Sequence, residues 1–247
     1  MILVSGYLGW KEDFLPVLPL LAEGGYHAYA YDHRGQHESP GPAGPEAYTL
    51  DTLAADLAQI VQQVSCPQSV HLVGLCMGAS VARLAAARSV EKVRTLTLVA
   101  ATLGTSLTQR LQLRAAATAS RFVEPKSVAR AVLAHWDRPS PRRGAAAGPD
   151  QGTQARLPGT SADHLLGLAR SWPRAEHRQH KAVLPGVPAL LIHGAKDSLY
   201  SADQYVRAAE VLEAPIVALP RAGHCVHLHQ PRAFTQTLLN FWRGLDG

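Results

Sequence analysis

VHLVGLCMGAS, at residues 70–80, joins an expected strand to an expected helix through a sharp turn. The apolar residues before the turn are typical of a strand that is buried on both faces, and the alanine-rich segment 79–88 after it favours a helix. The turn has the pattern Gly-x-Cys-x-Gly, in which Gly74 and Gly78 flank Cys76. This is the pattern of a nucleophile elbow, with cysteine where serine is commoner.

The elbow gives Cys76 the surroundings of a nucleophile. A tight turn holds the residue in strained backbone geometry, and the two glycines leave room for the neighbouring strand and helix. The helix that starts after Cys76 points its free N–H groups at the sulfur, which favours the thiolate. The alternative is a small buried thiol, a common role of cysteine. Because the elbow favours the nucleophile, we predict that Cys76 is catalytic.

The rest of the chain alternates strands with helices. Short apolar runs predict strands at 2–6, 27–31, 93–99, 187–193 and 215–219. Apolar residues at helical spacing predict helices at 14–22, from residue 50, around 203–212 and at 232–242. The alternation predicts an α/β fold with a mostly parallel sheet of about six strands and helices on both faces. The site in such a sheet lies at the carboxyl ends of the strands.

Two later residues occupy the places that an acid and a base need. Asp197 comes four residues after the expected strand 187–193, and His224 comes five residues after 215–219. Nucleophile, acid and base then follow one another in the chain order that a nucleophile elbow requires. We predict that His224 accepts the thiol proton, and that Asp197 holds the imidazole tautomer and balances the imidazolium.

Each of these assignments has a competitor nearby. Asp203 is another acid in this half, but it lies further on, at the start of a helix. His227 and His229 lie close to His224, yet His224 alone follows Ala-Gly at the strand end. The spacing of the three histidines also permits a metal cluster, but no acidic partner lies nearby in the sequence. We therefore predict no metal site.

Acyl transfer also needs backbone donors for the oxygen that becomes negative. We predict that they are the N–H of Met77 and an N–H just after the first strand, from Tyr7 or Leu8. The turn at 32–34 after the second strand reads as structural, with a position for His33 at the pocket mouth as the alternative.

Residues 104–181 interrupt the alternation of strands and helices. We predict a core formed by 1–103 and 182–247, with this segment inserted as a helical cap, or lid, after the fourth strand. Helices are expected at 106–121 and 126–136. The part at 138–160 is rich in proline, glycine and small residues, which predicts a flexible loop.

The order and spacing of the motifs resemble the α/β-hydrolase family. The matching segments are SGYLG at 5–9, DHRGQHESPGP at 32–42, GLCMGAS at 74–80, GAKDS at 194–198 and AGHCVHLHQP at 222–231. The resemblance implies the α/β-hydrolase fold, but it says much less about the substrate.

The sequence departs from the family pattern in three ways. Ser5 stands where the family often has histidine, Cys76 replaces serine, and the chain starts at what would be the third strand of an eight-strand pattern. A short start is similar to plant methylesterases and hydroxynitrile lyases, which build a six-stranded sheet. The alternative is a sequence that begins downstream of its true start.

A cysteine nucleophile narrows the expected chemistry. Its acyl-enzyme is a thioester, which forms easily from another thioester and less favourably from an oxoester, and which readily passes its acyl group to an amine or an alcohol. We therefore predict an esterase, thioesterase or transacylase acting on an ester, lactone or thioester in a biosynthetic or specialised-metabolite pathway. The alternatives are a lyase that uses His224 as its base, for example to eliminate acetate, and a ligand-binding relative without turnover.

The predicted cap and the core differ in net charge. The chain of 247 residues carries 24 basic and 19 acidic side chains, and the segment 104–181 holds 13 of the basic and five of the acidic ones. The positive excess thus lies in the predicted cap and favours an anionic small-molecule or carrier-bound acyl substrate. Nucleic acid is disfavoured, because the aromatic content of 6% offers little stacking surface.

Three cysteines, Cys66, Cys76 and Cys225, are too few and too scattered for a disulfide framework or a zinc cage. No apolar run approaches the ~20 residues of a membrane span. We therefore expect a cytoplasmic protein that uses no cofactor and does not bind membranes. The sequence does not indicate an oligomeric state.

Overall fold

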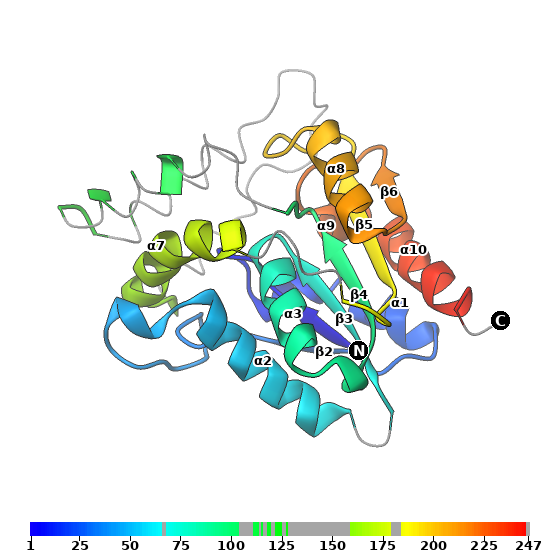
Figure 1. Ribbon diagram of the computed structural model, residues 1–247, viewed down its shortest axis with the longest axis horizontal. Coiled ribbons are helices and arrows are strands. Elements are labelled where there is room, and N and C mark those ends of the chain that lie inside the picture. Colours follow the sequence, from blue (N-terminus) through cyan, green and yellow to red (C-terminus); the bar gives the residue numbers. More distant parts are fainter. Residues whose placement is uncertain are drawn as a thin grey trace.

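A parallel sheet with helices on both faces organises the chain (Figure 1). The computed structural model describes residues 1–65, 68–103, 111–113, 115, 118–119, 122–124, 127, 159–178 and 184–245, with the backbone alone at 174–178. These residues form a six-stranded sheet in the order β2-β1-β3-β4-β5-β6, in which every neighbouring pair is parallel. The strands are β1 (Ile2–Val4), β2 (Tyr29–Tyr31), β3 (Val70–Leu75), β4 (Val93–Val99), β5 (Ala189–Gly194) and β6 (Ile216–Leu219). The predicted fold class is confirmed.

The central strands owe their position to continuous apolar sequence. All of β3 is buried, as expected for a strand that is covered on both faces. The strand predicted at 2–6 ends already at Val4, because the chain then enters a turn closed by a hydrogen bond from Gly9 N–H to Gly6 O of 3.2 Å. The strand expected at the start of 70–80 extends to Leu75, directly before Cys76.

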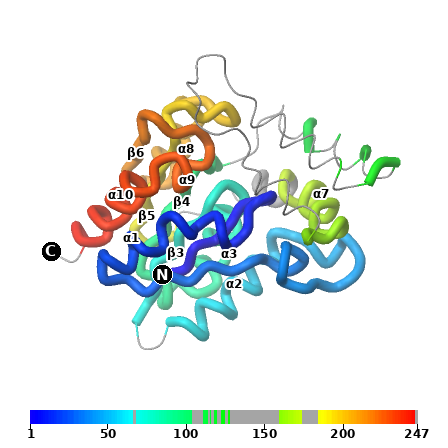
Figure 2. Tube along the Cα trace, turned by 180° about the vertical axis from the view of Figure 1, so that it is seen from behind, coloured from blue at the N-terminus to red at the C-terminus, as the bar shows by residue number. Residues whose placement is uncertain are grey.

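The helices cover the two faces of the sheet in separate layers. They are α1 (Leu18–Glu23), α2 (Leu50–Val64), α3 (Met77–Arg88), α7 (Ala162–Arg178), α8 (Ala202–Leu212), α9 (Val226–His229) and α10 (Pro231–Arg243), with short 3-10 turns η1 (Lys11–Phe14), η2 (Pro45–Ala47) and η3 (Val90–Lys92). Helices α2 and α3 lie on one face, and α1 and α10 lie on the other (Figures 1 and 2).

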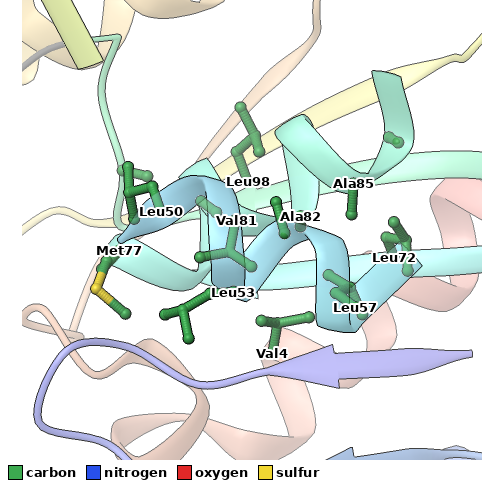
Figure 3. Packing of buried hydrophobic residues seen from close by; sticks show 14 of the residues in the cluster. Val4, Leu50, Leu53, Leu57, Leu72, Met77, Val81, Ala82, Ala85 and Leu98 are labelled. Carbon is green, nitrogen blue, oxygen red and sulfur yellow. The ribbon is translucent and has the colours of Figure 1, made fainter. Parts of the chain in front are cut away.

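Small side chains let α3 pack closely between α2 and the sheet. Ala82 and Ala85 of α3 are fully buried, and Val81 packs among Leu53 and Leu57 of α2 (Figure 3). Helix α2 presents this face because its apolar residues recur at intervals of three to four residues, and Thr49 caps its first turn. The packing fixes the start of α3, and hence the elbow, relative to the sheet.

The carboxyl ends of four strands meet along one edge of the sheet. The register pairs Val4 of β1 with Gly74 of β3, and Gly194 of β5 with Leu219 of β6. The loops that follow these strands carry the residues predicted for the site, so parallel pairing alone brings distant parts of the chain together.

Helix α7 is an element that the sequence analysis did not predict. It lies inside the segment 104–181 that we expect to form the cap, and it packs beside α2 and η2. The predicted helix at 126–136, except for Ser127, and most of the one at 106–121 lie outside the described residues. The loop 138–160 also lies outside them, except for its last two residues. The cap boundaries therefore stay a prediction.

Within the part of the chain that the structure describes, no helix has both the length and the hydrophobicity needed to cross a lipid bilayer. The cytoplasmic location stays a prediction.

Candidate active site

Cys76 lies on a strained turn between β3 and α3. Its backbone has φ 51° and ψ −117°, a region that residues with a side chain seldom adopt. The Cys76 N–H donates a hydrogen bond of 2.8 Å to the carbonyl of Val99, which ties the turn to β4. The strain and this tie together hold the side chain at the carboxyl edge of the sheet.

The two elbow glycines, Gly74 and Gly78, lie where the backbones of β1, β3 and α3 are in close contact. A Cβ atom on Gly74 would lie 2.4 Å from the carbonyl oxygen of Gly78, and one on Gly78 would lie 2.3 Å from that of Ser5. Distances this short exclude any side chain unless the backbone moves. The glycines thus allow β1, β3 and α3 to approach closely enough to form the elbow.

The loops after β5 and β6 bring Asp197 and His224 together. His224 Nδ1 donates a hydrogen bond of 2.8 Å to Asp197 Oδ2, and the carboxylate is only 1% exposed. The Lys196 N–H donates to the carbonyl of Ala222 at 2.9 Å. A Cβ on Gly194 would lie 2.4 Å from the same carbonyl oxygen, so the two loops are in backbone contact.

The charges in the site favour a protonated His224 beside an ionised Asp197. Burial lowers the pKa of His224, but the Asp197 carboxylate, the charge of Cys76 and hydrogen bonds to both residues raise it well above its usual value. Burial raises the pKa of Asp197, but His224 and further hydrogen bonds lower it overall. The structure thus brings Cys76, His224 and Asp197 into one chain of interacting side chains.

The predicted oxyanion donors lie on both sides of Cys76. Met77 is the first residue of α3, where a backbone N–H has no partner inside the helix. Tyr7 and Leu8 are the central residues of the turn from Gly6 to Gly9. A Cβ on Gly6 would lie 3.4 Å from the Cβ of Cys76, so this turn lies directly against the elbow.

His33 and Gln36 support that turn. The sequence analysis gave His33 a structural role but did not identify Gln36. Gln36 Nε2 donates to the carbonyl of Gly6 at 3.0 Å, and His33 Nε2 lies 3.3 Å from the carbonyl of Ser5. The His33 N–H also donates to Gln36 Oε1 at 3.1 Å. Both side chains are buried, so the structure does not support the alternative that His33 lies at the pocket mouth.

Helix α7 is anchored to the same region. The Tyr7 hydroxyl donates to the carbonyl of Leu165 at 2.7 Å, and His164 Nδ1 donates to the carbonyl of Arg34 at 2.8 Å. His164 is completely buried, with its ring edge-on to that of Tyr48. The oxyanion turn is therefore held between its own strand, the turn at 32–36 and α7.

The competing histidines have other partners. His229 Nδ1 accepts a hydrogen bond of 2.9 Å from the N–H of Gly223 and so supports the loop that carries His224. His227 is buried between the rings of Phe14 and Phe234. No sequence pattern reveals the His229 contact, because it depends on the path of the loop.

Among the described residues, one group of side chains has ligand atoms close enough to hold a metal ion, formed by Glu12, His37 and Glu38. The Lys11 ammonium group already contacts both of its carboxylates. This group shares no residue with the Cys76 site. Cys225 is half-buried beside His224, and Cys66 lies outside the described residues.

Comparison with known proteins identifies the family of the chain. A family model described as the alpha/beta hydrolase fold matches residues 1–231. Epoxide hydrolase A of Mycobacterium tuberculosis (strain ATCC 25618 / H37Rv) is 26% identical over an alignment of 299 positions, gaps included, which covers 100% of this chain and 91% of that protein.

Solved structures agree with the fold. A hydrolase from Pseudomonas aeruginosa PA01 has a TM-score of 0.78 at 24% identity, over 98% of this chain and 88% of that one. The enol-lactonase from Burkholderia xenovorans LB400 has a TM-score of 0.75 at 21% identity, over 98% and 90%. The match of the family model extends from β1 through the loop that carries His224, and so includes every residue of the site. The chain therefore belongs to the α/β-hydrolase family of enzymes.

Proposed function

We propose that this protein is an acyl-transfer enzyme that acts on an ester, lactone or thioester through Cys76, His224 and Asp197. One observation carries the proposal: a cysteine on a strained elbow raises the pKa of a histidine, and this histidine donates to a buried carboxylate at 2.8 Å. Nucleophile, base and orienting acid in this relation are the arrangement of covalent acyl transfer.

The proposed reaction has two stages, which are acylation of Cys76 and transfer of the acyl group to an acceptor. His224 takes the proton of Cys76, which its raised pKa favours, and the Cys76 thiolate attacks the carbonyl carbon. The N–H groups of Met77 and of Tyr7 or Leu8 bind the oxygen that becomes negative. The carbonyl re-forms, the bond to the leaving group breaks, and His224 returns the proton to the leaving oxygen or sulfur. Water or another acceptor then loses a proton to His224 and attacks the thioester carbonyl. The C–S bond breaks, the acyl group leaves on the acceptor, and His224 returns the proton to Cys76 Sγ.

The chemistry of sulfur favours acyl substrates over epoxides, although one relative is named an epoxide hydrolase. Attack of Cys76 on an epoxide carbon would form a thioether, which has no carbonyl group that water could attack. A lactone, the substrate class in the name of the enol-lactonase, gives a thioester that water can cleave. Turnover through Cys76 therefore requires a carbonyl substrate.

The proposed substrate also carries negative charge. The segment 104–181 holds 13 basic and five acidic residues. A basic cap would attract a carboxylate, a coenzyme A thioester or an acyl chain on a carrier protein. Such substrates suit a biosynthetic or specialised-metabolite pathway, and none of them requires a nucleic acid or a membrane.

The test compares two alanine variants on a matched pair of substrates, an acyl-coenzyme A thioester and a p-nitrophenyl ester of the same acyl chain. We expect Cys76→Ala and His224→Ala each to lower kcat/KM by at least about 10³-fold, because both residues act in the same step. Cys225→Ala is the matched control and should keep wild-type activity.

Three other outcomes would contradict the proposal. Turnover that survives in Cys76→Ala but is lost in His224→Ala would indicate a lyase that uses His224 as its base. Turnover that survives in both variants would place the reaction elsewhere. Tight binding of the thioester without product over hours would indicate a ligand-binding relative.

A further inference from the structure

The Asp197 carboxylate accepts a hydrogen bond that the triad does not include. The Tyr205 hydroxyl donates to Asp197 Oδ2 at 2.6 Å, the same oxygen that accepts from His224 Nδ1 at 2.8 Å. The second oxygen, Oδ1, accepts from the N–H of Leu199 at 2.8 Å. Three donors therefore surround a carboxylate that is 1% exposed.

The position of the Tyr205 hydroxyl is fixed by its surroundings. Tyr205 lies in the first turns of α8 and is completely buried. Its ring stacks on His193 of β5, with centroids 4.2 Å apart and planes at 16°, and the ring of Tyr200 meets it edge-on at 5.7 Å. Packing on two sides therefore aims the hydroxyl at Asp197.

We infer that Tyr205 is a positioning residue of the active site, which orients the Asp197 carboxylate toward His224 and shares the negative charge of the oxygen that His224 uses. The inference rests on the proposed roles of Asp197 and His224. It adds to them a fourth residue, on a helix that contributes no group to the Cys76–His224–Asp197 chain.

The Tyr205 hydroxyl stays protonated and therefore remains a hydrogen-bond donor. Burial raises the pKa of Tyr205, and the neighbouring Asp197 carboxylate raises it further, so the phenol stays protonated. Its hydrogen bond in turn lowers the pKa of Asp197 and opposes the effect of burial. Tyr205 thereby helps to keep a buried carboxylate ionised.

Removal of the hydroxyl would change how strongly Asp197 holds the imidazole proton. Without Tyr205, the charge on Oδ2 is shared with one donor instead of two, so the imidazolium is stabilised more. Among the described residues, the titratable groups that face His224 are Asp197 after β5, Cys76 at the elbow and Tyr200, whose ring centroid lies 6.1 Å away. A tighter hold on the proton slows its return to the leaving group.

The test uses Tyr205→Phe, with Tyr48→Phe as the matched control. Tyr48 is also completely buried, and its hydroxyl also makes a 2.6 Å hydrogen bond, to the carbonyl of Pro42, away from Asp197. We expect the pKa of His224, followed by NMR of the folded protein without substrate, to rise by about one unit in Tyr205→Phe and to stay unchanged in Tyr48→Phe.

Kinetics supply the second readout. Tyr205→Phe should lower kcat by about tenfold at an unchanged KM, and should move the acid limb of the kcat profile to higher pH. An unmoved pKa of His224, or equal effects of the two phenylalanine variants on kcat and thermal stability, would reduce Tyr205 to a packing residue and overturn the inference.

Failure of the proposed function would look different. The NMR titration needs no turnover, so a raised pKa of His224 in Tyr205→Phe supports the inference even if no acyl substrate is turned over. Conversely, turnover that requires Cys76 together with an unmoved pKa of His224 would retain the function and overturn the inference.

Discussion

Asp197→Asn is expected to lower kcat/KM for acyl substrates by about 10³-fold while the protein stays folded. The reason lies in the donors around the side chain. His224 Nδ1 and the Tyr205 hydroxyl both donate to one oxygen of Asp197, and the Leu199 N–H donates to the other. An asparagine offers one acceptor oxygen and one NH2 donor. Because donors lie on both sides of residue 197, the NH2 group must face another donor in either orientation.

Either orientation of the amide damages the site. If the NH2 group faces His224, the imidazole must change tautomer and carry its proton on Nε2, where it cannot accept the thiol proton. If the NH2 group faces Leu199, two N–H groups oppose each other and the loop must shift. The carboxylate is therefore required for its two acceptor oxygens as well as for its charge.

Asp203→Asn is the matched control for this change. Asp203 lies in the first turn of α8, six residues after Asp197, with its side chain exposed. We expect the kcat/KM of the Asp203→Asn enzyme to stay within about twofold of wild type, because the substitution alters only a solvated carboxylate. An Asp197→Asn enzyme that kept kcat/KM within tenfold of wild type would show that the carboxylate does not orient His224.

Acid is expected to destabilise the protein through two buried histidines, His33 and His164. Burial lowers the pKa of His33 to about 4 against the opposing effects of Ser5, Asp56 and Asp32. Burial and the charge of His33 lower the pKa of His164 to about 3, against its hydrogen bond to Arg34. Of the described polar atoms, none pairs with His33 Nδ1 or His164 Nε2, the nitrogens that would take the added proton.

The sign of the effect follows from proton uptake. Both histidines titrate near 6.5 when the chain is unfolded, so below that pH the unfolded state binds more protons than the folded state. The stability that these residues contribute is therefore complete above about pH 7.5 and falls as the pH falls. At pH 5 the loss reaches, as an upper bound, about 2 kcal/mol for each histidine.

Urea unfolding at pH 7.5 and pH 5 measures this loss. We expect His164→Gln to halve the loss, because glutamine can donate to the Arg34 carbonyl as His164 does but does not titrate. His27→Gln, which removes an exposed histidine, is the control and should leave the loss unchanged. An equal loss in wild type and His164→Gln would show that His164 does not hold α7 in a pH-dependent way.

The positions of Cys76, Asp197 and His224 are accessible from sequence because of one physical rule. Parallel strands that are joined by helices end at the same edge of the sheet, so polar residues directly after such strands come together whatever their separation in the chain. Strand and elbow patterns are local, and each could be read from five to seven neighbouring residues. The geometry between the loops follows from the pairing of the strands.

The supporting contacts could not be predicted in the same way. Tyr205, Gln36 and His229 act through single hydrogen bonds whose partners depend on how a loop or helix is placed by packing. Helix α7 was missed because Pro173 interrupts its helical pattern and a stretch rich in glycine and proline precedes it. Tertiary packing of its buried face overrides these local signals.

The central claim is that acyl transfer passes through a covalent bond to Cys76, and intact-mass spectrometry tests it most directly. The protein is mixed with the acyl-coenzyme A thioester or the p-nitrophenyl ester, quenched in acid during the first turnover, weighed and mapped by peptide digestion. We predict one added acyl group on Cys76 in wild type and in Cys225→Ala, and no adduct in Cys76→Ala. An adduct of undiminished yield in Cys76→Ala would contradict the account.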